Sequence, residues 1–61
     1  MRKFNFGKYE ALMENAKDAK RDDLYNITII DSQSRESKHK CNYLFKSEAY
    51  EEILEFFETS F

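Results

Sequence analysis

The sequence lacks several residues that small proteins use to stabilise themselves. It has no proline, no tryptophan, a single glycine and one cysteine, Cys41. One cysteine excludes an internal disulfide, although chains of this size often depend on disulfides or metals. A lone cysteine also fits a reducing compartment, so we expect a cytoplasmic location.

Membrane and catalytic signals are missing as well. No apolar run approaches the ~20 residues of a membrane span, and the N-terminus has no apolar core of a signal peptide. The sequence contains none of the patterns GxxxxGK, GxGxxG, HExxH, GxSxG or CxxC. We therefore expect no membrane association, no cofactor, no metal and no enzymatic activity, and the residues match no family motif.

What the sequence has in abundance is aromatic and charged side chains. At 61 residues there is room for one domain, over residues 1–61, and one modest core. Six phenylalanines and four tyrosines supply the large side chains for that core. The net charge of −2 conceals a segregated distribution, because residues 48–61 carry five glutamates and no lysine or arginine. This segregation predicts faces of opposite charge in the folded protein.

The segment 47–61 has the clearest pattern, that of an amphipathic helix. At about 100° per residue, its glutamates fall within one arc of roughly 120°. The opposite arc is apolar and holds Ala49, Tyr50, Ile53, Leu54, Phe56, Phe57 and Phe61. We expect Ser47 to cap this helix.

The rest of the chain predicts a hairpin and a second helix. Residues 24–31 and 38–45 have strand composition and alternation, with the polar turn 32–37 between them. Residues 8–20 show helical spacing of Tyr9, Leu12, Met13, Ala16 and Ala19. The segment 2–6 is either a short strand or a helix start capped by Asn5. The predicted fold is α+β, with αββα or βαββα order and the antiparallel hairpin packed against both helices on one sheet face.

The hairpin register follows from its apolar positions. Residues that oppose each other in an antiparallel pair share a face. We therefore expect Tyr25, Ile27 and Ile29 to face Phe45, Tyr43 and Cys41, so that paired numbers sum to 70. Phe4 and Phe6, or a partner, would then cover the second face of the sheet.

The glutamates of the last helix form the clearest candidate for a partner-binding surface. Their carboxylates make one ridge without an interleaved lysine, formed by Glu48, Glu51, Glu52, Glu55 and Glu58. The ridge predicts docking on a basic partner, and the plain alternative is a solvated face that keeps the protein soluble. Phe56 and Phe61 edge an apolar arc wider than one thin sheet covers. They would either join an interface with a target or a second copy, or complete the small core.

Two further groups of residues carry side chains that could have a chemical function. His39 and Cys41 are two apart on one strand face. A zinc site would need a further His or Cys, which the sequence lacks, and nucleophilic catalysis would need a pocket and an oxyanion hole, which so small a core can hardly enclose. We therefore expect a buried thiol and an edge imidazole. A basic set near the hairpin could contact phosphates, and it comprises Arg35, Lys38, Lys40 and Lys46.

These observations predict a non-enzymatic protein-binding module, an inhibitor or adaptor. Its partner would be a protein with a basic surface, and a homo-oligomer is a second option. The alternative is a small nucleic-acid-binding module that uses the basic hairpin, which the acidic net charge disfavours. As a class, an aromatic-rich, charge-segregated chain of this length resembles the small inhibitors that phages direct at host enzymes or defence systems, with host cytoplasm as the location.

Overall fold

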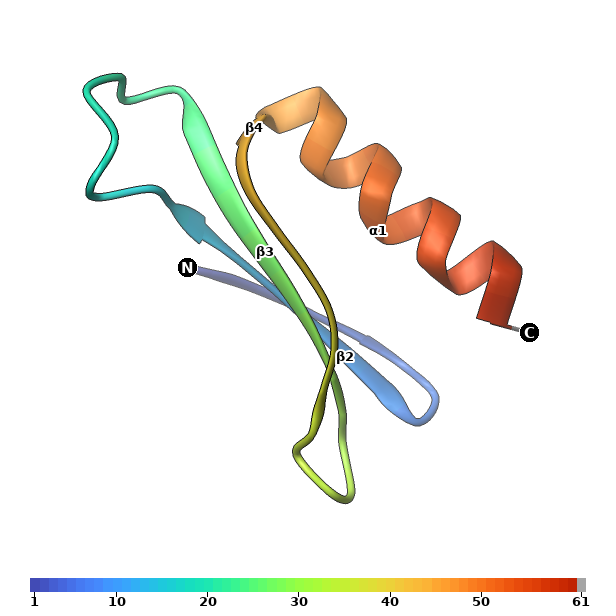
Figure 1. The fold of residues 1–61 in the computed structure, drawn as a ribbon. Helices are drawn as coiled ribbons and strands as arrows, with labels where there is room; N and C mark the ends of the chain where they lie inside the picture. The colour runs from blue at the N-terminus through green and yellow to red at the C-terminus, as the bar shows by residue number, and fades with distance from the viewer. Residues whose placement is uncertain (61) are drawn as a thin grey trace.

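A four-stranded antiparallel sheet and one helix make up the described part of the chain, residues 1–60 of the computed structural model (Figure 1). The strands follow one another in the sheet in chain order, and α1 lies across one face of it. The elements are β1 (Arg2–Phe6), β2 (Tyr9–Asn15), β3 (Leu24–Asp31), β4 (Ser37–Phe45) and α1 (Lys46–Ser60). Over these residues no helix has the length and apolar character needed to cross a bilayer.

The predicted N-terminal helix is wrong, and with it both the αββα and the βαββα order. Most of the segment 8–20 is strand β2, which pairs with β1 on one side and β3 on the other. Tyr9 and Met13 are four apart, a spacing that places residues on one face of a helix and also of a strand. Ala11 decides between them, because it is 0% exposed and lies under the helix with Met13.

A turn signal at Gly7 distinguishes the two possibilities. Phe6 pairs with Tyr9, which leaves a two-residue turn that begins with Gly7 at φ 58°. Such hairpin turns need a positive φ at the first position, where glycine is unstrained. Of the two interpretations of residues 2–6, the strand is therefore correct.

The predicted register of the β3–β4 hairpin is also wrong, although the bounds of both strands are confirmed within one residue. Tyr25 pairs with Leu44 and Ile27 pairs with Cys41, so β4 contains an extra residue between these pairs. Tyr43 sits at this bulge with φ 61°, and its N–H donates to Asn26 Oδ1 at 3.1 Å. A bulge residue of this kind reverses the facing of the residues that follow it.

The reversal changes which aromatic side chains reach the core. Leu44 packs against the core, whereas Tyr43 and Phe45 are 50% and 43% exposed. The expected common face of His39, Cys41, Tyr43 and Phe45 thus ends after Cys41.

The core lies between α1 and the sheet face that the helix covers. Its buried members are Ala11, Met13, Ile27, Ile29, Ala49, Ile53 and Phe57. Phe4 and Phe6 belong to this face and not to the second one. The ring of Phe4 packs edge-on against that of Tyr50, with the ring centroids 6.0 Å apart, and the ring of Phe6 stacks on that of Phe57, with the centroids 4.1 Å apart. The expectation that both phenylalanines cover the far face is wrong.

The start of α1 has a different cap from the predicted one. Ser47 lies inside the helix, which begins at Lys46. Phe45 precedes the first helical residue, and its N–H donates to Glu48 Oε1 at 3.0 Å. A glutamate at the third helical position that reaches back in this way satisfies an N–H that the helix leaves open. Glu48 therefore has a structural role at the helix N-terminus.

Candidate functional site

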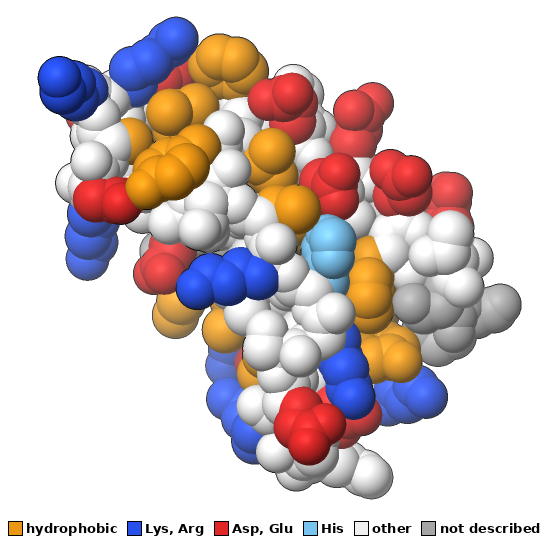
Figure 2. Space-filling model, in the orientation of Figure 1, with side chains coloured by type: hydrophobic (Ala, Val, Ile, Leu, Met, Phe, Trp, Pro, Cys, Tyr) orange, Lys and Arg blue, Asp and Glu red, His pale blue; other side chains and the backbone are white. Residues whose placement is uncertain are grey.

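The structure divides the predicted acidic ridge of α1 into two groups. Glu48 caps the helix, and Glu52 is half-buried beside β4, with Oε2 3.1 Å from His39 Nε2. Glu48 is exposed as well, but the carboxylates of the other three, Glu51, Glu55 and Glu58, are exposed without a hydrogen bond or ion pair in the described residues. Figure 2 shows acidic side chains in a row along α1, with the histidine at their inner edge. Only part of the ridge is thus available to a partner.

The exposed glutamates share their side of the helix with one leucine. Leu54 is 55% exposed and follows Glu51 by three residues. Residues spaced i, i+3, i+4 and i+7 lie on one side of a helix. We call this set the outer stripe: Glu51, Leu54, Glu55 and Glu58.

An apolar groove adjoins the outer stripe on the side of β1. Its lining consists of Phe4, Phe6, Tyr50, Ile53 and Leu54. Leu54 therefore belongs to both features and connects them. Phe56, a predicted interface residue, does not line this groove. It is half-buried, and its ring centroid lies 5.2 Å from that of Tyr9 and 5.8 Å from that of His39. Phe61, its predicted companion, lies outside the described residues.

The alternative basic surface is not assembled in one place. Arg35 is in the turn after β3, and Lys46 begins α1 at the opposite end of β4. Lys38 Nζ is 3.2 Å from Glu36, and Arg35 Nη1 is 3.0 Å from Glu10. Two of the four cations thus already have carboxylate partners.

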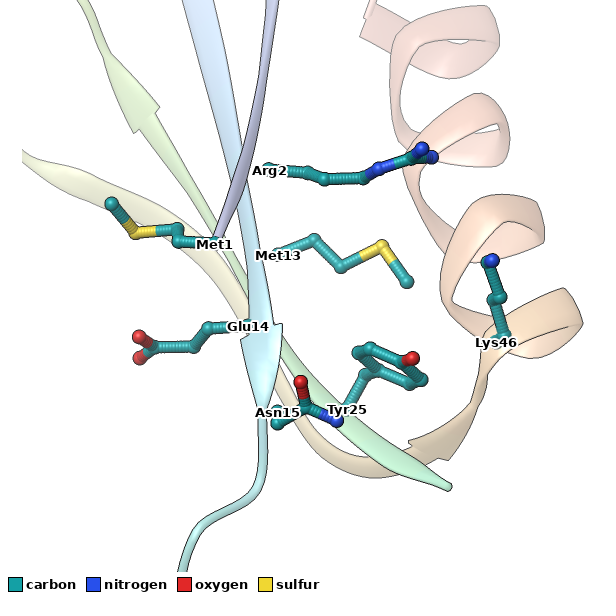
Figure 3. Close-up of a pocket in the computed structure, with 7 residues that line it drawn as sticks. All are labelled: Met1, Arg2, Met13, Glu14, Asn15, Tyr25 and Lys46. Atoms are coloured by element: carbon teal, nitrogen blue, oxygen red, sulfur yellow. The ribbon is translucent and has the colours of Figure 1, made fainter. Parts of the chain in front are cut away.

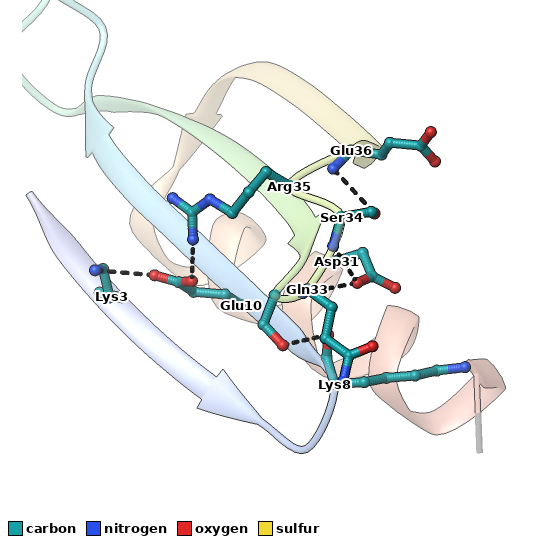
Figure 4. A network of polar contacts seen from close by, with 9 residues as sticks. Lys3, Lys8, Glu10, Asp31, Gln33, Ser34, Arg35 and Glu36 are labelled. Atoms are coloured by element: carbon teal, nitrogen blue, oxygen red, sulfur yellow. Dashed lines mark hydrogen bonds and ion pairs between the residues drawn. The ribbon is translucent and has the colours of Figure 1, made fainter.

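Glu10 is at the centre of a polar network on the sheet face away from α1 (Figure 4). Lys3 from β1 and Arg35 from the β3–β4 turn approach its carboxylate from two sides, at 2.9 and 3.0 Å. The hydrogen bond from Lys3 and the positive charges of both partners lower the pKa of Glu10. Asp31 orders the same turn, because its carboxylate accepts the N–H groups of Ser34 and Gln33, which lower its pKa.

A cavity of about 200 Å³ opens near the start of α1 (Figure 3). Arg2, Met13 and Tyr25 reach from the strands toward the helix, while Met1 and Glu14 point away. The remaining lining residues are Asn15 and Lys46. The lining has neither histidine nor cysteine, so this cavity offers no thiol or imidazole for catalysis.

In the described residues, the one group of three His, Cys, Asp or Glu side chains close enough to share a metal ion is His39, Cys41 and Glu52. Cys41 Sγ is 3.4 Å from His39 Nε2 and 3.9 Å from Glu52 Oε2. Desolvation and the nearby Glu52 carboxylate raise the pKa of the Cys41 thiol. The sequence points to His39 and Cys41 as a pair, but its helical periodicity predicts that Glu52 belongs to the solvent-facing ridge. No periodicity in the sequence indicates that it turns toward β4.

The comparisons with known proteins give no match: no protein-family model, curated protein or solved structure resembles this chain significantly. Its function must therefore be inferred from its own side chains.

Proposed function

We propose that this chain is a non-enzymatic protein-binding module, an inhibitor or adaptor, which docks on a basic partner through the outer stripe of α1. The observation that carries the proposal is the position of Leu54. An exposed leucine between carboxylates combines an apolar anchor with charges that select the partner.

The charges of the stripe support a partner of opposite sign. Glu51, Glu55 and Glu58 form no ion pair within the described residues, whereas Glu10, Asp23 and Glu36 each lie within 3.2 Å of a lysine or arginine nitrogen. Most ridges formed for helix stability alone mix charges at i, i+4. Unneutralised carboxylates in a row instead make the local electrostatic potential more negative, which speeds encounter with a cationic surface.

The apolar groove beside Leu54 extends the docking area. A partner side chain that covers Leu54 would also reach Phe4 and Phe6 at the edge of the sheet. Helix-binding partners commonly seat such i, i+3, i+4, i+7 sets in a groove. We expect the partner to present an apolar pocket rimmed by lysine or arginine. A second copy of the chain is a poorer fit, since two outer stripes would repel each other.

The test compares charge-reversed variants with the same net charge. The stripe variant is Glu51→Lys with Glu55→Lys, and the control is Glu14→Lys with Asp22→Lys, both exposed and outside α1. Proteins captured from a lysate by the wild-type chain are purified, and their association rates are measured at low and high salt. We expect the stripe variant to associate about 10-fold more slowly at low salt and the control to match the wild type.

The Leu54→Ala variant tests the anchor separately. It should raise the dissociation rate and leave the salt dependence of association unchanged. The proposal is overturned if every captured protein associates with the stripe variant and the wild type at the same rate.

A further inference from the structure

We propose that His39, Cys41 and Glu52 bind a divalent transition-metal ion of the Zn²⁺ class, linking β4 to α1. This site is independent of the outer stripe, because none of its three residues belongs to that stripe. The metal site is a function separate from protein docking, and it lies on the flank of α1 that faces β4, away from the groove beside Leu54.

The spacing of the donor atoms fits such an ion. In a tetrahedral zinc site, N and O donors at about 2.0–2.1 Å and a sulfur donor at about 2.3 Å lie about 3.3–3.6 Å apart. The three separations here, 3.1, 3.4 and 3.9 Å, each lie within about 0.3 Å of that range. The circle through the three atoms has a radius of about 2.0 Å, so an ion slightly off their plane reaches all three at bonding distance.

The fold holds the donors in this position from two elements. His39 and Cys41 alternate with Lys40 on β4, so both face α1. Glu52 comes from the second turn of α1, on the flank nearest β4. The His39 ring stacks on Phe56 at 5.8 Å and an angle of 25°, which restricts its orientation. Little rearrangement is therefore required to bind the ion.

The fourth coordination position faces solvent. A shallow opening beside the cluster is lined by His39, Glu52, Glu55, Phe56 and Thr59. Water can enter there and complete a four-coordinate shell of three protein ligands and one water. His39 and Glu52 have side chains 35% and 37% exposed, so the ion can enter directly from solution.

The donor set selects the class of metal. Imidazole nitrogen and thiolate sulfur suit Zn²⁺ and its neighbours, whereas Mg²⁺ and Ca²⁺ prefer oxygen ligands. The Cys41 thiol binds as thiolate, so its proton passes to the buffer when the Sγ–metal bond forms. The cation also neutralises the repulsion between the thiolate and the Glu52 carboxylate.

The experiment titrates the tag-free chain with Zn²⁺ by calorimetry and with Co²⁺ by absorption spectroscopy. We expect one ion per chain and a thiolate-to-Co²⁺ charge-transfer band. Cys41→Ser should abolish that band, and Cys41→Ser, His39→Asn and Glu52→Gln should each weaken binding by at least about 10-fold. Glu58→Gln, an exposed carboxylate of the same helix, should bind as the wild type does.

Circular dichroism of each metal-free variant separates loss of a ligand from loss of the fold. At equal concentration, Zn²⁺ should also raise the melting temperature of the wild type by more than that of Cys41→Ser. The proposal is overturned if Co²⁺ gives no thiolate band, or if folded variants bind within about twofold of the wild type.

Discussion

A pair of substitutions in β2 discriminates strand from helix in the N-terminal half of the protein. Ala11 is 0% exposed, opposite Phe4 in β1 and Ile29 in β3, on the face under α1. Leu12 points to the other face and is only half-buried. A helix over residues 8–20 would give the opposite arrangement, with Leu12 in the core stripe and Ala11 outside it. Ala11→Leu and Leu12→Ala therefore have opposite expected severities in the two cases.

The magnitudes follow from burial. Adding three carbons to a filled core costs about 1–3 kcal/mol, so Ala11→Leu should reduce the free energy of unfolding by that amount. Leu12→Ala removes side-chain atoms that still contact water, and it should cost about 1 kcal/mol or less. A chain of 61 residues has a total stability of about 3–9 kcal/mol. The first variant therefore loses a large share of the total.

Urea unfolding followed by circular dichroism measures both values. With a slope of about 1 kcal/mol per molar urea, Ala11→Leu should lower the midpoint by about 1–3 M and Leu12→Ala by less than about 1 M. The reverse order, with Leu12→Ala the more damaging, would refute the assignment of Ala11 to the buried sheet face.

Two further predictions concern carboxylates with structural roles. Because Lys3 holds the pKa of Glu10 below its ordinary value of about 4.5, the stabilisation is present above that pH and is lost as the pH falls through the lowered pKa. Glu10→Gln should therefore flatten the loss of stability between about pH 5 and pH 2, as followed by thermal melts. Glu48→Ala leaves the Phe45 N–H unpaired and should cost about 0.5–2 kcal/mol, whereas Glu51→Ala should change the melting temperature little. Equal effects of the two alanine substitutions would contradict the capping role of Glu48.

The helices and strands whose apolar residues follow a single period were predictable from the sequence. The last helix was expected from residue 47 and begins at Lys46, and β3 occupies the predicted residues 24–31. The strand at residues 9–15 was not predictable in this way, because the spacing of Tyr9 and Met13 fits both the helical period and the strand period. The spacing of the apolar residues predicts a helix there, whereas Gly7 between two alternating runs is a hairpin signal. Packing of β2 between β1 and β3 then outweighs any local helical preference.

The candidate sites also contain residues that the sequence places correctly and one that it does not. Periodicity placed Glu51, Glu55 and Glu58 on the outer side of the last helix, where the structure has them exposed. It gave no reason to separate Glu52, which is at the margin of the same arc. Only the packing angle of α1 on the sheet turns that carboxylate toward His39 and Cys41.

By itself, the sequence determined the amphipathic C-terminal helix, the hairpin strands and the concentration of acidic charge at one end of the chain. These depend on local periodicity and composition, which near neighbours along the chain decide. The tertiary structure alone decided the four-stranded sheet, the bulge at Tyr43 and the meeting of Glu52 with β4. Each of these requires residues distant in sequence to be brought into contact, and burial of the shared core determines how they meet.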